Sequence, residues 1–324
     1  MPLYEDPEFP RHSVSSLSSC KIVWRRPNAI VRTPKFFGCD DSLITSEQHI
    51  ERRKEIRGNR SAFFLMTVAG LTNNVDKFSQ VVPRQTFGNE YTGKFLFNFF
   101  ENGAKTTVTI DDLLPTLETG TLLFSDCVGD AFWFPLLEKA YAKFCGGYDQ
   151  INTGLPLYAL RHLTGKEVEC IDNENGGSLP FSPHGMYEKL AHWSSKKCLI
   201  VCKLNDNRHF NNEKHGSGFT VTGVQEGKRP SNDGIFSQKK FVKLRHSSGI
   251  IEKGLADEMG ISEIDENGEG LMDVEKFVRQ MQCVYSVDVE MESLGRNDGL
   301  DAFAPFIPII QRSDVVSKHR CRRH

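Results

Sequence analysis

Residues 62–72 (AFFLMTVAGLT) constrain the fold of this chain more than any other segment, because they are apolar almost all round. A helix with no polar face has no side to turn to water, so it has to be buried. Residues 132–144 (FWFPLLEKAYAKF) predict a second buried helix, with Pro135 tolerated in its first turn and Gly146-Gly147 ending it. At 324 residues the chain can enclose both helices in one large core or in two lobes.

The second half of the chain has the pattern of a sheet. Strand-like runs separated by polar loops predict an antiparallel sheet, and they cover residues 199–204, 219–224 and 240–245. Residues 272–282 predict an amphipathic helix, and residues 284–289 predict a last strand. The sequence therefore predicts an α+β fold with a helical first lobe, an antiparallel β-rich second lobe and a cleft between them.

The first half also contains a hairpin signal. Residues 93–100 and 105–110 are rich in aromatic and β-branched side chains, and Glu101-Asn102-Gly103 joins them. The first fifty residues are rich in proline and serine. They are expected to form an irregular arm on the surface of the first lobe.

Composition excludes several classes of protein. Hydrophobic content of 39% and charged content of 25% are typical of a globular protein in water, and a net charge of −2 gives no reason to expect nucleic acid as a partner. No apolar run reaches the roughly 18 residues of a membrane helix, and the first residues lack the layout of a signal peptide. The nine cysteines show no CxxC spacing, which favours reduced thiols in the cytoplasm over disulfides or zinc.

Five segments, in order along the chain, carry a resemblance to a known family. They are YEDPEFP (4–10), IVWRRPNAIVRTPKF (22–36), FWFPLLEKAYAKFCGGY (132–148), TVTGVQE (220–226) and NGEGLMDVEKFVRQ (267–280). Together they resemble the protease core of the calpains, the calcium-dependent cytosolic cysteine proteases. The resemblance implies a papain-like, two-lobed core, with a first lobe at 1–157, a second at 158–290 and a flexible extension at 291–324.

The resemblance also implies where the active site lies. In the family, a cysteine at the start of a buried helix is the nucleophile, a histidine on the other lobe accepts its proton, an asparagine orients the histidine, and a glutamine helps to hold the oxyanion. The corresponding positions here carry Ala62, Ser217, His246 and Ile56. A methyl group cannot attack a carbonyl, and serine has no pKa near neutrality. We therefore interpret the chain as a pseudoprotease that acts by binding or regulation.

One alternative stays open, a calpain-family peptidase with a relocated active site. Its nucleophile would be Ser61 or a cysteine, and its base would be His215 or His246. The cysteines nearest to predicted elements are interpreted as structural thiols instead, because they adjoin apolar runs: Cys145, Cys198 and Cys202.

The substrate cleft implied by the resemblance has changed as well. Residues 152–166 correspond to the family's glycine-rich substrate loop, and here they include Leu155-Pro156-Leu157. This change is expected to hinder the approach of an extended peptide backbone. Positions that would line the cleft are Gly154, Tyr158, Gly216 and Gly218.

Calcium is the one cofactor that the resemblance suggests, with one site in each lobe. The first-lobe site is expected to be absent, because Arg53 and Ala131 stand where the family has carboxylates. In the second lobe, candidate ligands are Glu252, Asp257, the carbonyl oxygen of Asp265, Asn267 and Glu269. The alternative for residues 265–270 is an exposed acidic turn without metal.

The binding partner of the chain is expected to be a protein, whose identity the sequence does not give. Two basic segments are candidate contacts for acidic partners or membrane lipids, and they lie at residues 52–60 and 312–323.

Overall fold

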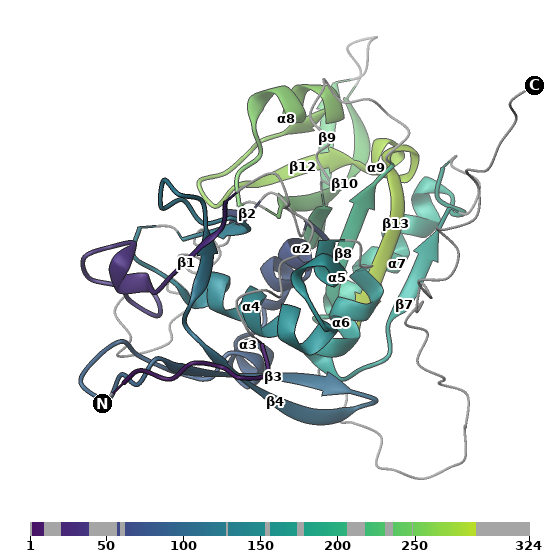
Figure 1. Cartoon of the computed structure of the whole chain (residues 1–324). Coiled ribbons are helices and arrows are strands. Elements are labelled where there is room, and N and C mark those ends of the chain that lie inside the picture. Colours follow the sequence, from purple (N-terminus) through teal and green to yellow (C-terminus); the bar gives the residue numbers. More distant parts are fainter. Residues whose placement is uncertain are drawn as a thin grey trace, which may run out of the picture. The chain divides into compact units, whose positions relative to one another are not determined.

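The computed structural model describes residues 2–9, 21–38, 57–58, 62–127, 129–152, 156–173, 178–205, 218–230, 236–247 and 249–289 (Figure 1). The chain divides into two units, residues 1–291 and 292–324. The predicted flexible extension at 291–324 lies outside the described residues, so the following description concerns the first unit.

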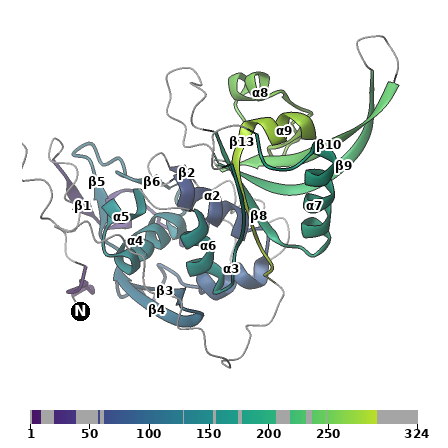
Figure 2. The ribbon, with the colours of Figure 1, turned by 90° about the vertical axis from the view of Figure 1, so that its right-hand side faces the viewer.

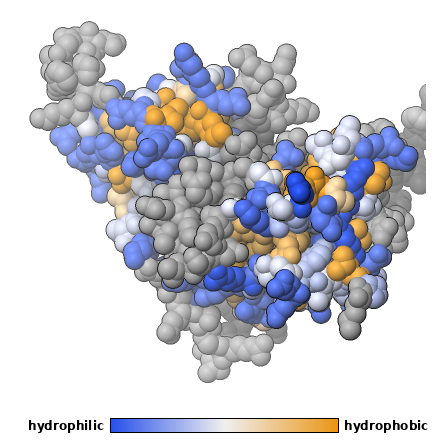
Figure 3. Space-filling model, turned by 90° about the vertical axis from the view of Figure 1, so that its left-hand side faces the viewer, coloured by the Kyte–Doolittle hydropathy of each residue, from blue (hydrophilic) through white to orange (hydrophobic). Residues whose placement is uncertain are grey.

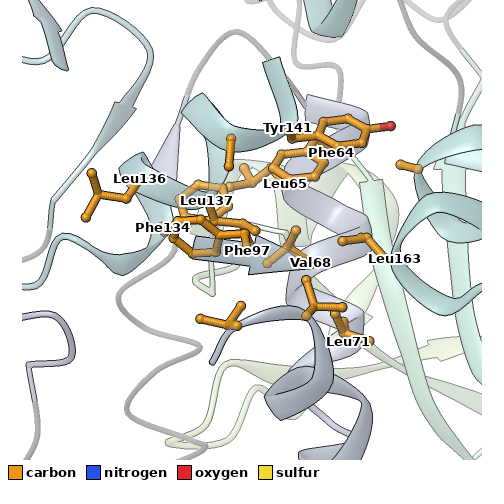
Figure 4. Packing of buried hydrophobic residues seen from close by; sticks show 14 of the residues in the cluster. Phe64, Leu65, Val68, Leu71, Phe97, Phe134, Leu136, Leu137, Tyr141 and Leu163 are labelled. Carbon is orange, nitrogen blue, oxygen red and sulfur yellow. The ribbon is translucent and has the colours of Figure 1, made fainter. Parts of the chain in front are cut away.

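Two buried helices form the centre of the first core, as predicted. Helix α2 spans Ala62–Leu71 and helix α4 spans Trp133–Cys145. Pro135 lies in the first turn of α4, and Gly146 ends the helix with a left-handed φ of 90°, a conformation that suits glycine. The Phe64 and Tyr141 rings of the two helices stack on each other (Figure 4). Their centroids lie 4.2 Å apart.

The predicted hairpin packs on the same core. It consists of β3 (Lys94–Glu101) and β4 (Ala104–Asp111), and the turn residues Asn102 and Gly103 have φ values of 51° and 77°. Two positive φ angles in a row are the geometry that an Asn-Gly turn favours. Three more helices complete this core: α3 (Val75–Val81), α5 (Tyr148–Asn152) and α6 (Pro156–Thr164).

A seven-stranded antiparallel sheet forms the second half, in the order β11-β12-β10-β9-β8-β13-β7. The predicted runs become β8 (Leu199–Leu204), β9 (Gly218–Pro230) and β10 (Phe236–His246). The other strands are β7 (Glu169–Asp172), β11 (Ile261–Ser262), β12 (Glu269–Asp273) and β13 (Met281–Val287). The α+β class and the antiparallel pairing are confirmed.

Successive side chains of a strand point to opposite faces of the sheet. In this sheet, each face packs against one of the two hydrophobic cores. On β8, Leu199 and Val201 join the first hydrophobic core, whereas Ile200 and Cys202 join the second. Helices α7 (Pro183–Ser195) and α9 (Val274–Gln280) pack on the second face, and α2 lies against the first (Figure 2). A short helix, α8 (Lys253–Met259), precedes β11.

Two predicted element boundaries are corrected. The helix expected at 272–282 begins only at Val274, because Asp273 still belongs to β12 and its carboxylate caps the helix by accepting the Glu275 N–H. The last strand, expected at 284–289, already begins at Met281 and ends at Val287. The lobe boundary after Leu157 stays a prediction; helix α6 spans this position, and its buried Ala159, Leu160 and Leu163 belong to the first core.

The N-terminal arm is held more firmly than a surface arm. Phe9, Phe36 and Phe37 are buried in the first core. The short strand β1 (Val23–Arg25) of the arm pairs with β5 (Leu114–Thr116). After the arm, β2 (Arg57–Gly58) pairs with β6 (Ser125–Asp126).

The described surface mixes hydrophilic and hydrophobic side chains, as the face drawn in Figure 3 illustrates. Its exposed large hydrophobic side chains lie in separate elements and in loops between elements: Val75, Leu96, Tyr158, Phe181, Ile250 and Ile264. None of the helices in the described residues is long and apolar enough to cross a membrane.

Candidate functional site

The predicted nucleophile position, Ala62, is the first residue of α2. Met66 lies one helical turn further on and packs against Gly218, where an added Cβ would meet the Met66 sulfur at 1.9 Å. Residues four apart share one face of a helix. The start of β9, which directly follows Ser217, therefore lies beside the first turns of α2.

His246, at the position predicted to orient the histidine, is the last residue of β10 and lies near the starts of α2 and β9. Its ring packs edge-on against Phe219, with the two centroids 5.1 Å apart. The Ser247 N–H donates to the Gly218 carbonyl oxygen at 3.0 Å. The fold thus brings together the ends of α2, β9 and β10, although they are far apart in sequence. Ile56 and Ser217 themselves lie outside the described residues, as do Ser61 and His215.

The chemistry of the candidate site follows from the N-terminal end of α2. The first N–H groups of a helix have no partner within it, and the helix dipole adds positive potential there. Such a position lowers the pKa of a cysteine thiol and prepares it as a nucleophile. Ala62 offers no group that this potential can activate.

The cysteine thiols of the described residues have raised pKa values, the opposite of what a nucleophile needs. Burial raises the pKa of every one of the six, to about 12 for Cys145 and about 11 for Cys283. The others, with pKa values raised chiefly by the same cause, are Cys127, Cys170, Cys198 and Cys202. A reactive thiol requires a lowered pKa.

One group that sequence reasoning missed is a thiol, phenol and imidazole cluster between α4 and α6. Cys145 hydrogen-bonds with Tyr141, whose hydroxyl lies 3.0 Å from Nδ1 of His162. Burial, with the charge of Arg161 adding, lowers the pKa of His162 to about 4. Since the Cys145 pKa is about 12, transfer of its proton to His162 is strongly disfavoured, and the cluster is not an activated pair.

The predicted substrate loop is largely a helix. Residues 156–164 form α6, in which Tyr158 is 38% exposed. Proline at the first helical position has the φ angle that a helix needs, so Pro156 begins α6 instead of interrupting a loop. Gly154 and Gly216 lie outside the described residues, and Gly218 is enclosed by Met66.

The candidate calcium ligands do not converge as side chains. Glu252 and Asp257 are exposed at α8, while Glu269 bonds to the guanidinium of Arg245, with Nη2 and Oε1 3.0 Å apart. No group of three or more His, Cys, Asp or Glu side chains in the described part of the chain is arranged to hold a metal. The calcium site stays a prediction, and the described arrangement does not fit it. For the first-lobe site, Ala131 is buried and Arg53 lies outside the described residues.

Comparison with known proteins identifies the class. A model of the calpain family of cysteine proteases matches residues 4–253, more than half of the chain. The chain therefore belongs to the calpain family, and its mixture of helices and antiparallel strands is consistent with a calpain protease core.

Individual relatives agree with this assignment. Calpain-8 of Mus musculus is 28% identical over 328 residues, which cover 91% of this chain and 44% of that protein. Calpain-14 of Homo sapiens is 30% identical over 266 residues, covering 77% of this chain and 35% of that protein. Calpain clp-1 of Caenorhabditis elegans is 28% identical over 309 residues, covering 86% and 37%. The chain spans less than half the length of these relatives.

Proposed function

We propose that this chain is a catalytically inactive member of the calpain family, which acts by binding or regulating other proteins. The observation that carries the proposal is the residue at the first position of α2, where the resemblance places the nucleophile. This residue is Ala62. Its methyl group has no lone pair with which to attack a peptide carbonyl.

Two further observations support the proposal. The described thiols all have raised pKa values, so none of them is prepared to replace the missing nucleophile. The proton-acceptor position carries Ser217 in place of histidine, and the orienting position carries His246 in place of asparagine. Losses at several catalytic positions together remove the concerted chemistry.

Such a protein can still fold and bind partners, because the packing of the two hydrophobic cores does not depend on catalytic side chains. Most of the buried side chains of α2, α4 and the central strands are hydrophobic or aromatic. We infer that the chain competes with active relatives for partners or regulators, or holds partners together. Its partners are expected to be proteins in the cytoplasm.

The deciding experiment is a cleavage assay on the purified chain. Casein and a fluorogenic peptide are incubated with it, with and without about 5 mM calcium, beside an active calpain as positive control. Thiol-directed and serine-directed activity probes are applied in parallel. We expect no turnover and no labelling of an active-site residue in any condition.

The alternative, a relocated active site, makes the opposite prediction. Turnover that is abolished by His215→Ala or His246→Ala would refute the proposal. His192→Ala is the matched control, because His192 is an exposed histidine on α7, outside the candidate site. Turnover lost in all three variants would point to misfolding, and thermal unfolding of each variant identifies that case.

A further inference from the structure

A cavity lies between the N-terminal arm, strand β4 and the last turn of α4. Its volume is about 430 Å³, a size typical of binding pockets. Its lining includes Tyr4 and Glu8 of the arm, Lys94 at the start of β3, residues 107–109 of β4 and Lys143 of α4. None of these residues belongs to the candidate site, which lies at the ends of α2, β9 and β10.

Strand β4 turns a free backbone edge toward this cavity. The Thr109 carbonyl oxygen points away from β3, where it accepts a hydrogen bond from Nζ of Lys143 at 2.9 Å. In an antiparallel pair, residues bonded to the partner strand alternate with residues whose N–H and C=O groups point outward. Thr107, two positions before Thr109, therefore points both groups outward as well. Among the described residues, Thr107 has no backbone hydrogen bond with any segment beyond the hairpin.

Two lysines line the cavity, and they differ in their ion pairs. Lys143 is bound to Asp6 and Glu8, with N–O distances of 2.9 Å in both pairs. Lys94 forms no ion pair in the described part of the chain, and its Nζ lies 5.5 Å from the centroid of the Tyr4 ring. Lys94 therefore gives the cavity a cation that can attract a carboxylate from outside the chain.

We propose that β4 binds an extended segment of another protein, which adds a third strand to the hairpin at Thr107 and places an acidic side chain beside Lys94. Strand addition takes its affinity from backbone hydrogen bonds and its specificity from side-chain pockets. A two-stranded sheet is marginal by itself and gains stability from a third strand. Exposed strand edges are commonly blocked by proline or lysine, whereas Thr107 is an exposed threonine, a residue type that favours strands. The inference rests on β4 and not on the proposed loss of catalysis.

The test is a selection of displayed random peptides, about ten residues long, on the full chain. Thr107→Pro removes the outward N–H, and proline is tolerated at such positions of an edge strand. Thr107→Ser keeps this N–H and is the matched control. Lys94→Glu reverses the charge in the cavity. Its matched control is Lys105→Glu, because Lys105 is an exposed lysine of the same hairpin that does not line the cavity.

We expect the selected peptides to be acidic and free of proline. In fluorescence anisotropy, labelled synthetic copies should bind the wild type and both controls equally, and should bind Thr107→Pro and Lys94→Glu at least about tenfold more weakly. Methylating one of the two alternating sets of peptide backbone nitrogens should weaken binding to the wild type by a similar factor. A selection without binding peptides would overturn the proposal, and so would binding that either Thr107→Pro or Lys94→Glu leaves unchanged. If thermal unfolding shows that Thr107→Pro does not fold, the methylated peptides take its place.

Discussion

The stability of this protein should depend on pH through one histidine of the first core. His162 on α6 is partly buried, and its Nδ1 lies 3.0 Å from the Tyr141 hydroxyl. The Phe144 ring packs edge-on against it, with the two centroids 5.0 Å apart. Burial lowers the pKa of His162 to about 4, because a charged imidazole would lose water in this place. Protonation of His162 is therefore disfavoured in the folded state.

The size and the sign of the effect follow from linkage. The unfolded chain has a histidine pKa of about 6.5, so between pH 6.5 and 4 it binds more protons than the folded protein. The free energy of unfolding accordingly falls as pH falls through this window. The full loss, present below the folded pKa, is about 3 kcal/mol from the pKa difference. Partial exposure of the ring makes this figure an upper bound.

The measurement is urea unfolding of the wild type and His162→Gln at pH values from about 7 to about 4. Carboxylates also titrate in this range, so the informative quantity is the difference between the two proteins. Glutamine accepts the Tyr141 hydrogen bond but takes up no proton, and His162→Gln should lose about 2–3 kcal/mol less than the wild type. His192→Gln, at an exposed histidine, controls for the loss of any histidine. Equal losses in the wild type and His162→Gln would refute the reasoning.

Two further substitutions test the packing. Lys139 is 1% exposed, pairs with Asp111 and donates to the Leu113 carbonyl oxygen at 2.7 Å. Lys139→Met leaves Asp111 buried without this counter-charge. The substitution should therefore lower the free energy of unfolding, measured in urea, by about 3–5 kcal/mol. A cost below about 1 kcal/mol would contradict this account. Gly268→Ala should destabilise by about 2 kcal/mol or more through a positive φ and a backbone clash, whereas Gly120→Ala, with a positive φ and open space, should cost only about 1 kcal/mol. Equal costs for the two alanines would mean that the clash is relieved by movement.

Where the sequence predicted the fold correctly, a local signal and the final packing agree. Helix α2 has no polar face and is buried, and Asn102-Gly103 fixes the β3–β4 turn by its positive φ angles. Helix α7 was missed although its signals are present, since Ser182 caps it and Pro183 takes its first position. No element was predicted for the segment between residues 173 and 198.

Other features depend on contacts that no local pattern shows. Met272 has the spacing of a helix residue, yet it pairs with Val242 across the sheet and belongs to β12. Long-range pairing overrides local periodicity there. The contact of Arg245 with Glu269 likewise requires the β10–β12 register, which brings together residues more than twenty positions apart. The sequence marked Glu269 as a candidate ligand but gave no sign of the cation beside it.

The described structure is compatible with the proposed loss of catalysis. Ala62 begins α2, Ser217 directly precedes β9, and His246 ends β10, so the replaced positions lie at the ends of elements. The residues that hold these elements lie further inside, such as Phe64, which is fully buried and stacks on Tyr141. Stability comes mainly from such buried side chains, and little of it depends on groups at a cleft. A calpain core that keeps its packing can therefore lose its nucleophile and still present a folded surface to a partner.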